Sequence, residues 1–215
     1  MSKHFSDFRL LVMDMDSTLI TIECIDEIAD FTGKKSEVAT ITAAAMRGDM
    51  DWPASLRQRV QLLAGLNDDV LQRVYDERLQ LSPGAETLIN AAHDAGIYTL
   101  LVSGGFTFFT ERLKNRLGLN AAFANQLEII DGKLTGRVIG ELCDDDGKAR
   151  HLREAAQRLG IVRGQIMAIG DGANDLKMMA EAGTSIAYCA KPIVQSQATH
   201  TINSAGLAAV LALFN

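Results

Sequence analysis

Acidic side chains follow the first apolar run of the sequence. Residues 10–13 read Leu-Leu-Val-Met, and Asp14 and Asp16 come directly after them. A short apolar run that ends abruptly is typical of a buried parallel strand opening into a loop. Two carboxylates spaced i, i+2 point the same way in extended backbone, so they take separate roles only if the loop curls. One could then attack phosphorus and form an acyl phosphate while the other transfers protons. The alternative, for an isolated Asp-x-Asp, is a solvated strand end.

Two further apolar runs also end in small or acidic residues. The run 100–102 leads into Ser103-Gly104-Gly105, and the run 166–169 leads into Gly170-Asp171-Gly172-Ala173-Asn174-Asp175. Each ending alone is ordinary loop chemistry. In a parallel sheet, however, the carboxyl ends of the strands meet at one edge, where ligands bind. Asp14, Asp16 and Asp171 would gather hard oxygen ligands there. Such ligands suit Mg²⁺, which relieves their mutual repulsion and polarises a phosphoryl oxygen.

Two further positions could hold the phosphate itself. The Ser103 hydroxyl and the backbone N–H groups after it are expected in a turn ahead of a helix, whose N-terminus aids anion binding. As a bare pattern, Ser-Gly-Gly is more often plain turn chemistry. Lys148 is expected to open a helix just after Asp144-Asp145-Asp146, a position that is unfavourable for the helix dipole. Two interpretations stay open: Lys148 neutralises those three aspartates, or it offsets charge on a phosphate and an aspartyl group.

The elements that position these residues alternate between strands and helices. The expected elements are strand 10–13, helix 84–95, strand 98–102, helix 106–117, a hairpin of strands 126–130 and 133–138 around Asp131-Gly132, helix 147–159, strand 166–169, helix 173–182, strands 185–188 and 201–202, and a terminal helix ending near Leu213. Such alternation predicts an α/β fold built on a doubly wound parallel sheet.

Residues 21–79 carry no strand pattern. Helices are expected around 22–29 with Gly33 as C-cap, over 36–47 up to Gly48, from Pro53 to before Gly65, and from Asn67 or Asp68 onward. This stretch predicts a helical cap inserted after the first strand. Residues 1–20 and 80–215 would then form the catalytic core.

Composition argues against several classes of protein. The formal net charge is −6 and no Lys/Arg-rich stripe is visible, so non-specific nucleic-acid binding is not expected. Cys24, Cys143 and Cys189 are odd in number and lack C-x-x-C spacing, which argues against a disulfide framework or a zinc site. No apolar run approaches the roughly 18–20 residues of a membrane span, and residues 1–9 lack the apolar core of a signal peptide. We therefore expect a cytoplasmic protein.

The four polar segments together resemble, in the same order, the four motifs of the haloacid dehalogenase superfamily. The resemblance implies a Rossmann-like core, Mg²⁺ and an aspartyl-phosphate intermediate. It also implies the following roles: Asp14 as nucleophile; Asp16 as general acid/base; Asp14, the backbone carbonyl of Asp16, and Asp171 as Mg²⁺ ligands; Ser103, Gly104 and Lys148 as phosphate-holding residues; Asn174 in the substrate-contacting loop; and Asp175 as a support of the metal site.

Within that superfamily, the chain resembles more narrowly the phosphatases that hydrolyse O-phospho-L-serine, the last step of serine biosynthesis. That similarity runs from about residue 10 to residue 213. Glu23 matches the position that reads the substrate amino group, and Arg59 the position that clamps its carboxylate, with Arg57 as second choice. Arg binds a carboxylate bidentately, so the pairing is physically sensible. Met46 and Trp52 match apolar positions near the substrate, with Trp52 standing where a smaller aromatic is expected.

Other functions remain open at this stage. One is a phosphatase or phosphotransferase for another small phosphomonoester. Another is a phosphate-sensing module without turnover, although such a protein would usually lack Asp14, Asp16 or Lys148. The expected partner is a small-molecule substrate, not nucleic acid or a membrane, and a monomer or a homodimer is equally compatible with the sequence. Many bacterial relatives carry an N-terminal regulatory domain, and this sequence starts at the catalytic strand, so control by such a domain is not expected.

Overall fold

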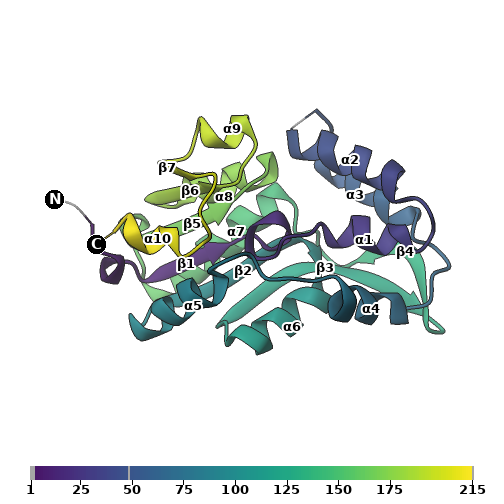
Figure 1. Cartoon of the computed structure of the whole chain (residues 1–215), viewed down its shortest axis with the longest axis horizontal. Coiled ribbons are helices and arrows are strands. Elements are labelled where there is room, and N and C mark those ends of the chain that lie inside the picture. The colour runs from purple at the N-terminus through teal and green to yellow at the C-terminus, as the bar shows by residue number, and fades with distance from the viewer. Residues whose placement is uncertain (1–2, 48, 215) are drawn as a thin grey trace.

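A seven-stranded sheet runs through the molecule in the order β4-β3-β2-β1-β5-β6-β7 (Figure 1). The structure, a computed structural model, describes residues 3–47 and 49–214, without the side chain of Met46. All neighbouring strands are parallel except β3 and β4, which form an antiparallel hairpin. The strands are β1 (Leu10–Met13), β2 (Tyr98–Phe106), β3 (Ala121–Ile130), β4 (Lys133–Ile139), β5 (Ile166–Gly170), β6 (Thr184–Tyr188) and β7 (His200–Ile202).

Helices cover both faces of this sheet because side chains alternate along each strand. On β1, Leu11 and Met13 belong to a core that includes residues of α5 (Ala85–Asp94) and α6 (Thr107–Leu117), whereas Leu10 and Val12 belong to a second core with α7 (Asp145–Leu159) and α8 (Leu176–Glu181). The predicted doubly wound α/β architecture is confirmed. Short helical segments also occur between the later strands and at the end of the chain: η3 (Arg163–Gln165), η4 (Ala173–Asp175), α9 (Pro192–Gln195) and α10 (Ala209–Ala212).

Residues between β1 and α5 form four helices beside the β3–β4 end of the sheet (Figure 1). They are α1 (Cys24–Asp30), α2 (Lys35–Arg47), α3 (Trp52–Gln61) and α4 (Asp69–Glu77), here called the helical insertion. The chain leaves and re-enters the core side by side, because Ile20 and Leu81 form an antiparallel bridge and the Thr21 N–H donates to the Gln80 carbonyl at 3.0 Å.

The helical insertion is also tied to the hairpin. The Gly65 N–H donates to the Leu134 carbonyl at 2.8 Å, and the Asp68 N–H donates to the Gly132 carbonyl at 2.9 Å. Asp131 and Gly132 both have positive φ, at 52° and 71°, as a type I′ turn requires. The turn that the Asp-Gly pair predicts therefore holds the hairpin and also supplies a partner for the insertion.

Several strand and helix boundaries differ from the sequence expectations, and three of them bear on the site. β2 continues to Phe106 instead of ending at residue 102, β3 starts at Ala121 instead of 126, and α7 starts at Asp145 instead of 147. The first two changes belong together, because the added start of β3 pairs in parallel with residues 100–102 of β2 and then, past a register shift, Asn125 pairs with Phe106. Within residues 3–47 and 49–214, no helix combines the length and apolar character that crossing a membrane requires.

Candidate active site

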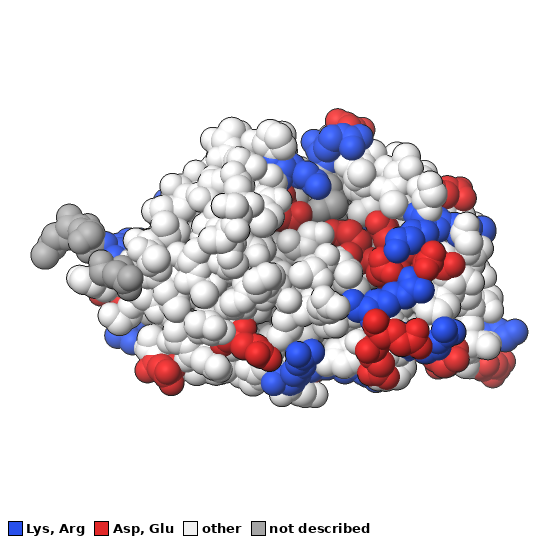
Figure 2. Space-filling view, in the orientation of Figure 1, with Lys and Arg blue, Asp and Glu red and all other residues white. Residues whose placement is uncertain are grey.

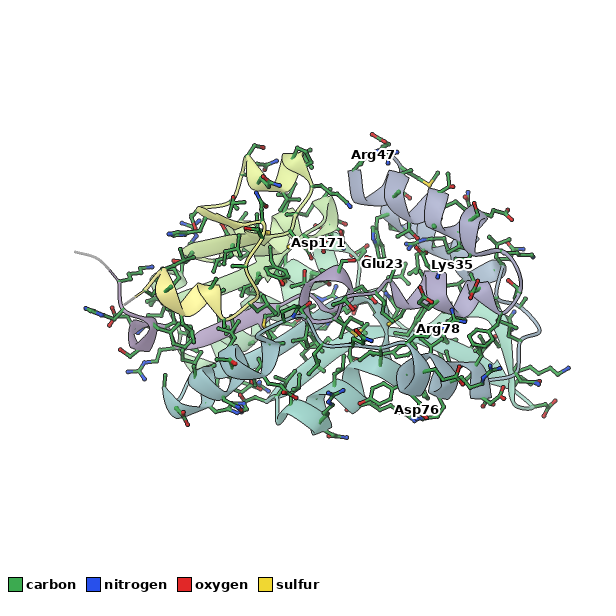
Figure 3. The ribbon with its side chains drawn as sticks, in the orientation of Figure 1. Glu23, Lys35, Arg47, Asp76, Arg78 and Asp171 are labelled. Atoms are coloured by element: carbon green, nitrogen blue, oxygen red, sulfur yellow. The ribbon has the colours of Figure 1, made fainter. Side chains whose placement is uncertain are left out.

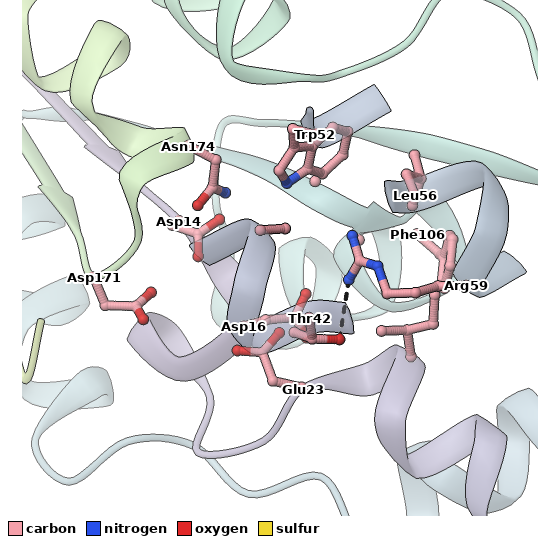
Figure 4. A pocket seen from close by; sticks show the side chains of 14 residues that line it. Asp14, Asp16, Glu23, Thr42, Trp52, Leu56, Arg59, Phe106, Asp171 and Asn174 are labelled. Carbon is pink, nitrogen blue, oxygen red and sulfur yellow. Dashed lines mark hydrogen bonds between the residues drawn. The ribbon is translucent and has the colours of Figure 1, made fainter. Parts of the chain in front are cut away.

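The chain curls directly after β1 and separates the two first aspartates. The Asp14 N–H still donates to a carbonyl of β5 at 3.0 Å, so strand geometry holds up to this residue. Met15–Leu19 then form one wide turn whose backbone is non-helical at Asp16 and Ser17, where Ser17 has a φ of 57°. The turn brings Asp16 back toward α1, where its Oδ1 accepts from the Cys24 N–H at 2.9 Å. The two carboxylates thus differ in surroundings, as separate roles require, yet both line one pocket (Figure 4).

Lys148 is the fourth residue of α7, because this helix begins at Asp145, two residues before the expected start. Asp144 caps the helix by accepting a backbone N–H at 2.8 Å. Asp145 and Asp146 pair with Lys177 at 2.9 and 2.8 Å. The interpretation of Lys148 as a partner for these three aspartates is therefore wrong, because each has another partner.

The Lys148 side chain instead points into the core between two other carboxylates. Its Nζ lies 2.5 Å from Asp14 Oδ1 and 2.7 Å from Asp175 Oδ1, and the side chain is 1% exposed. Burial lowers the pKa of Lys148, but the two aspartates overcome this and raise the pKa above its ordinary value. The ammonium group therefore stays charged, which places a fixed positive charge against the carboxylate expected to act as nucleophile.

Three buried aspartates gather beside this ammonium group. Carboxylate oxygens of Asp14, Asp171 and Asp175 all lie within 4.8 Å of one another. Burial, and then the charge of Asp175, raises the pKa of Asp171 to about 7. Burial also raises the pKa of Asp14 well above its ordinary value, against the opposing effect of Lys148. Such crowding is relieved by a divalent cation with oxygen ligands.

Hydrogen bonding shows which of these oxygens are free to bind a metal ion. Both oxygens of Asp175 already accept bonds, Oδ1 from Lys148 and Oδ2 from the N–H groups of Asp171 and Gly172 at 3.1 Å. Asp14 Oδ1 is occupied by Lys148, and Asp171 Oδ1 accepts from Thr18 at 3.2 Å. Within the described part of the chain, the second oxygen of Asp14 and of Asp171 has no donor. The donor set therefore fits Mg²⁺, with Asp175 fixing the loop behind it.

The Ser103-Gly104-Gly105 segment is a bulged extension of β2 and not a turn, which corrects a second expectation. The Gly105 N–H donates to Ser103 Oγ at 2.8 Å, and Ser103 Oγ lies 3.5 Å from Asp16 Oδ2. Both glycines are required by space. A Cβ on Gly104 would lie 2.4 Å from Trp52 Cζ2, and one on Gly105 would lie 2.5 Å from Asp16 Oδ2. The bulge therefore lets both the insertion and the acid/base candidate approach the backbone closely.

Glu23 stands at the start of α1, where the helical insertion meets the sheet. Figure 3 shows it near Asp171, which follows β5. Its Oε1 accepts from the Ser17 hydroxyl at 2.5 Å. Burial, and then the charges of Asp16 and Asp171, raises the pKa of Glu23 well above its ordinary value. An ammonium group placed beside Glu23 would offset this accumulation of negative charge.

Arg59 lies on the inner face of α3 and points into the pocket (Figure 4). It is 5% exposed, and its Nε donates to the Ser55 carbonyl at 3.3 Å. One NH group donates to Thr42 Oγ1 at 3.2 Å, and the guanidinium lies 6.0 Å from the Trp52 ring centre. Arg57, the competing choice, is exposed and lines a different groove. The geometry thus brings Arg59 and not Arg57 to the carboxylate-lined pocket.

The pocket opens between the sheet edge and the helical insertion. Figure 2 shows acidic side chains inside this hollow and basic ones at its rim. Asn174 reaches it from η4, and its buried Oδ1 has no partner among the described residues. Met46 belongs to α2, but its side chain lies outside the described part of the structure.

Several lining residues were missed from sequence. They are Ile25, Thr42, Ala45, Leu56 and Phe106. Thr42 could have been found, because it lies four residues after the buried Val38 and so on the same face of α2. Its hydroxyl donates to Asp26 Oδ1 at 2.8 Å while accepting from Arg59. The others are apolar positions that a sequence pattern cannot distinguish from ordinary core.

The chain belongs to the haloacid dehalogenase-like hydrolases, because the model of that family matches residues 11–180. A phosphoserine phosphatase of Polaromonas sp. is 54% identical over 213 residues, covering 97% of this chain and 90% of the relative. A solved structure described as a phospho-aspartyl intermediate analogue of phosphoserine phosphatase superposes with a TM-score of 0.93 at 40% identity, over 97% of this chain and 99% of the other. A substrate-bound phosphoserine phosphatase complex also gives a TM-score of 0.93, at 39% identity and the same coverage.

Proposed function

We propose that this protein hydrolyses O-phospho-L-serine to L-serine and phosphate, the last step of serine biosynthesis, through a phosphorylated Asp14. One observation carries the proposal. A single pocket combines a carboxylate held by a buried ammonium group with one acidic and one basic side chain from the helical insertion. The first pair suits phosphoryl transfer, and the second suits the zwitterionic head of an amino acid. The high identity to phosphoserine phosphatases along nearly the whole chain supports the same substrate.

The first half of the reaction transfers the phosphoryl group to the protein. A carboxylate oxygen of Asp14 bonds to phosphorus while the bond from phosphorus to the serine oxygen breaks. The Asp16 carboxyl donates its proton to that leaving oxygen. Burial raises the pKa of Asp16, although the hydrogen bond from the Cys24 N–H opposes this, so the proton is more readily held before transfer. Ser103, Gly104 and Lys148 hold the phosphoryl oxygens.

The second half regenerates the free carboxylate of Asp14. The Asp16 carboxylate takes a proton from water as the water oxygen bonds to phosphorus. The acyl phosphate bond then breaks and releases inorganic phosphate. Asp14, the backbone carbonyl of Asp16, and Asp171 would hold Mg²⁺, which when bound offsets negative charge on the phosphoryl oxygens. Asp175 keeps the Asp171 loop in place through its two backbone hydrogen bonds.

Residues 21–79 act in this proposal as the cap that selects the substrate over a core of residues 1–20 and 80–215. Glu23 binds the substrate ammonium, and Arg59 binds its carboxylate bidentately. Trp52 closes the apolar side of the pocket, and Asn174 contacts the substrate from the core. Closure of this cap excludes bulk water, so the aspartyl-phosphate forms fastest from a substrate that Glu23 and Arg59 bind. The proposal places the enzyme in the cytoplasm.

The first test replaces the proposed nucleophile. Asp14→Asn should lose essentially all release of phosphate from O-phospho-L-serine in the presence of Mg²⁺, and a chelator should abolish turnover by the wild-type protein. Asp146→Asn, which alters an exposed ion pair with Lys177, is the matched control and should keep wild-type turnover. Turnover by Asp14→Asn near the wild-type rate would refute the mechanism.

The second test separates the substrate from the chemistry. Arg59→Ala should lower kcat/KM for O-phospho-L-serine by about 10²-fold, since a charged hydrogen-bonded pair contributes roughly 1.5–3 kcal/mol. Hydrolysis of p-nitrophenyl phosphate should change little, because this ester has no carboxylate. Arg57→Ala removes a guanidinium two residues away that lies outside the pocket and serves as the control. Equal losses on both esters for Arg59→Ala would mean that Arg59 is structural and that the substrate is another phosphomonoester.

A further inference from the structure

The phosphate-holding segment of β2 leaves the sheet ladder at the point where β3 should pair with it. Val102 pairs with Phe123 and Phe106 pairs with Asn125, so three residues of β2 stand opposite one residue of β3. Peptide groups of residues 103–105 therefore lose regular partners on that side. A buried backbone group without a partner is costly, so another group must supply the bond.

Asn125 supplies that bond and a second connection. We propose that Asn125 is a positioning residue for the phosphate site, an inference that rests on the function proposed above. Its side chain is 1% exposed, and Nδ2 donates to the Gly104 carbonyl at 2.9 Å. The same Nδ2 lies 3.4 Å from the Cys143 carbonyl, and Oδ1 accepts from the Cys143 N–H at 2.9 Å. One amide thus joins two segments that are far apart in sequence.

Both segments lead to groups that hold the phosphate. Gly104 belongs to the bulge itself. Cys143 precedes Asp144, the N-cap of α7, and the Lys148 N–H donates to the Asp144 carbonyl at 2.8 Å. The amide of Asn125 therefore fixes the start of α7, and with it the helical turn that carries Lys148, relative to the bulge. The distance between the Ser103 bulge of β2 and the ammonium group of Lys148 depends on this bridge.

The chemistry requires asparagine at this position. The side chain must donate toward two carbonyls and accept from one N–H, and its amide does both in one orientation. An aspartate has the same shape but no donor when ionised, so it would face the two carbonyls with negative charge. Asn125→Asp therefore removes the donors with little change in volume. Asn125→Ser keeps a small polar group and leaves the bridge unspanned.

Asn120, the residue directly before β3, offers a matched control. Its Oδ1 accepts from the Thr99 N–H at 2.8 Å and from the Thr99 hydroxyl at 3.0 Å. This contact also joins the β3 side to β2, but it lies just before β3, away from the bulge. Asn120→Ala should therefore lower stability without touching the phosphate site.

The experiment measures the kinetic constants of these variants, normalised to the concentration of folded protein. Asn125→Asp and Asn125→Ser should lower kcat/KM by about 10- to 100-fold, the range associated with displacement of about 1 Å in an active site. The loss should be equal for O-phospho-L-serine and p-nitrophenyl phosphate, and the inhibition constant of inorganic phosphate should rise. Asn120→Ala should lower Tm and leave all three constants within about threefold, because a purely structural role moves stability alone.

Two outcomes would overturn the inference. Kinetic constants of folded Asn125→Asp and Asn125→Ser within about threefold of wild type would overturn it. Should neither variant fold, NMR of the wild-type protein decides: inorganic phosphate should shift the Asn125 side-chain amide resonances and leave those of Asn120 unchanged, and an unmoved Asn125 overturns the inference. Lys148→Ala separates the two proposals. If Lys148→Ala keeps its activity, the proposed function is contradicted. If Lys148→Ala loses its activity while the Asn125 variants keep wild-type kinetic constants, only this inference is contradicted.

Discussion

We expect Gly104→Ala to push the helical insertion away from the proposed phosphate site, by a distance that follows from the contact between residue 104 and Trp52. An added Cβ would lie 2.4 Å from Trp52 Cζ2 and 3.0 Å from its Cη2, whereas ordinary contact begins at 3.4 Å. Gly104 does not have left-handed φ, so alanine can adopt its backbone conformation. The substitution therefore acts through space and not through backbone strain, and it should move the Trp52 ring by about 1 Å, the shortfall in that contact.

The consequence for catalysis follows from what Trp52 carries. It opens α3, and the Arg59 guanidinium lies 6.0 Å from its ring. Moving the ring outward shifts α3 and the proposed carboxylate clamp away from the core. A misplacement of about 1 Å can cost 10²-fold in rate, so kcat/KM for O-phospho-L-serine should fall by about that factor. Hydrolysis of p-nitrophenyl phosphate should fall less, because it does not use Arg59.

A double-mutant cycle tests this reasoning. Trp52→Ala removes the ring that the new methyl group meets, so Gly104→Ala should cost little more in the Trp52→Ala background, with a coupling energy of about 1–3 kcal/mol. Gly105→Ala is the control, because its Cβ would meet Asp16 Oδ2 at 2.5 Å instead of the tryptophan. Trp52→Ala should not restore activity to Gly105→Ala. If Gly104→Ala costs the same factor with and without Trp52, the account of the contact is wrong.

Two further predictions concern the helical insertion. Thr42→Val keeps the shape of the side chain but removes the hydroxyl that accepts a hydrogen bond from Arg59. The kcat/KM for O-phospho-L-serine should therefore fall about tenfold, since a net hydrogen bond contributes roughly 1 kcal/mol or more. Hydrolysis of p-nitrophenyl phosphate should be unaffected, and Thr42→Ser should stay near wild type. An equal loss in Thr42→Ser would point to packing instead. Glu27→Gln should lower the free energy of unfolding by about 1 kcal/mol near neutral pH. Burial raises the pKa of Glu27, but hydrogen bonds from Lys35 and Arg78 outweigh it and lower the pKa from its ordinary value of 4.5. That stability is present above the ordinary pKa and is lost as pH falls through the lowered one, so urea unfolding of the two proteins should converge in acid. A constant difference down to about pH 3 would exclude the ionised pair as its source.

Much of the active site could be predicted because it depends on the order of elements along the chain. Asp14, Ser103 and Asp171 each follow a short apolar run of the sequence, and parallel strands bring their carboxyl ends to one edge. The placement of Arg59 in the pocket was also anticipated, although only through the family resemblance. Its competitor Arg57 is two residues away on the same helix, and the sequence alone does not decide which of the two faces inward.

What only the tertiary structure decided concerns partners from distant segments. The segment after residue 102 looks like a turn until β3 is placed beside it, when it becomes a bulge of β2. Three aspartates lie just before Lys148 in sequence, yet its ammonium group pairs with Asp14, directly after β1, and with Asp175, in η4. The bridge made by Asn125 joins two segments that it neighbours only in the folded chain.

The physical reason for this division lies in the range of the interactions. Hydrophobic periodicity and the conformational preferences of Gly, Pro and Asp act within a few residues, so the sequence by itself determined the elements, their alternation and the strand ends where chemistry is expected. Buried hydrogen bonds and ion pairs select their partners by distance and desolvation in three dimensions. The tertiary structure therefore decided which carboxylates share the Lys148 charge, which oxygens stay free for a metal ion, and how closely the helical insertion approaches the glycines of β2.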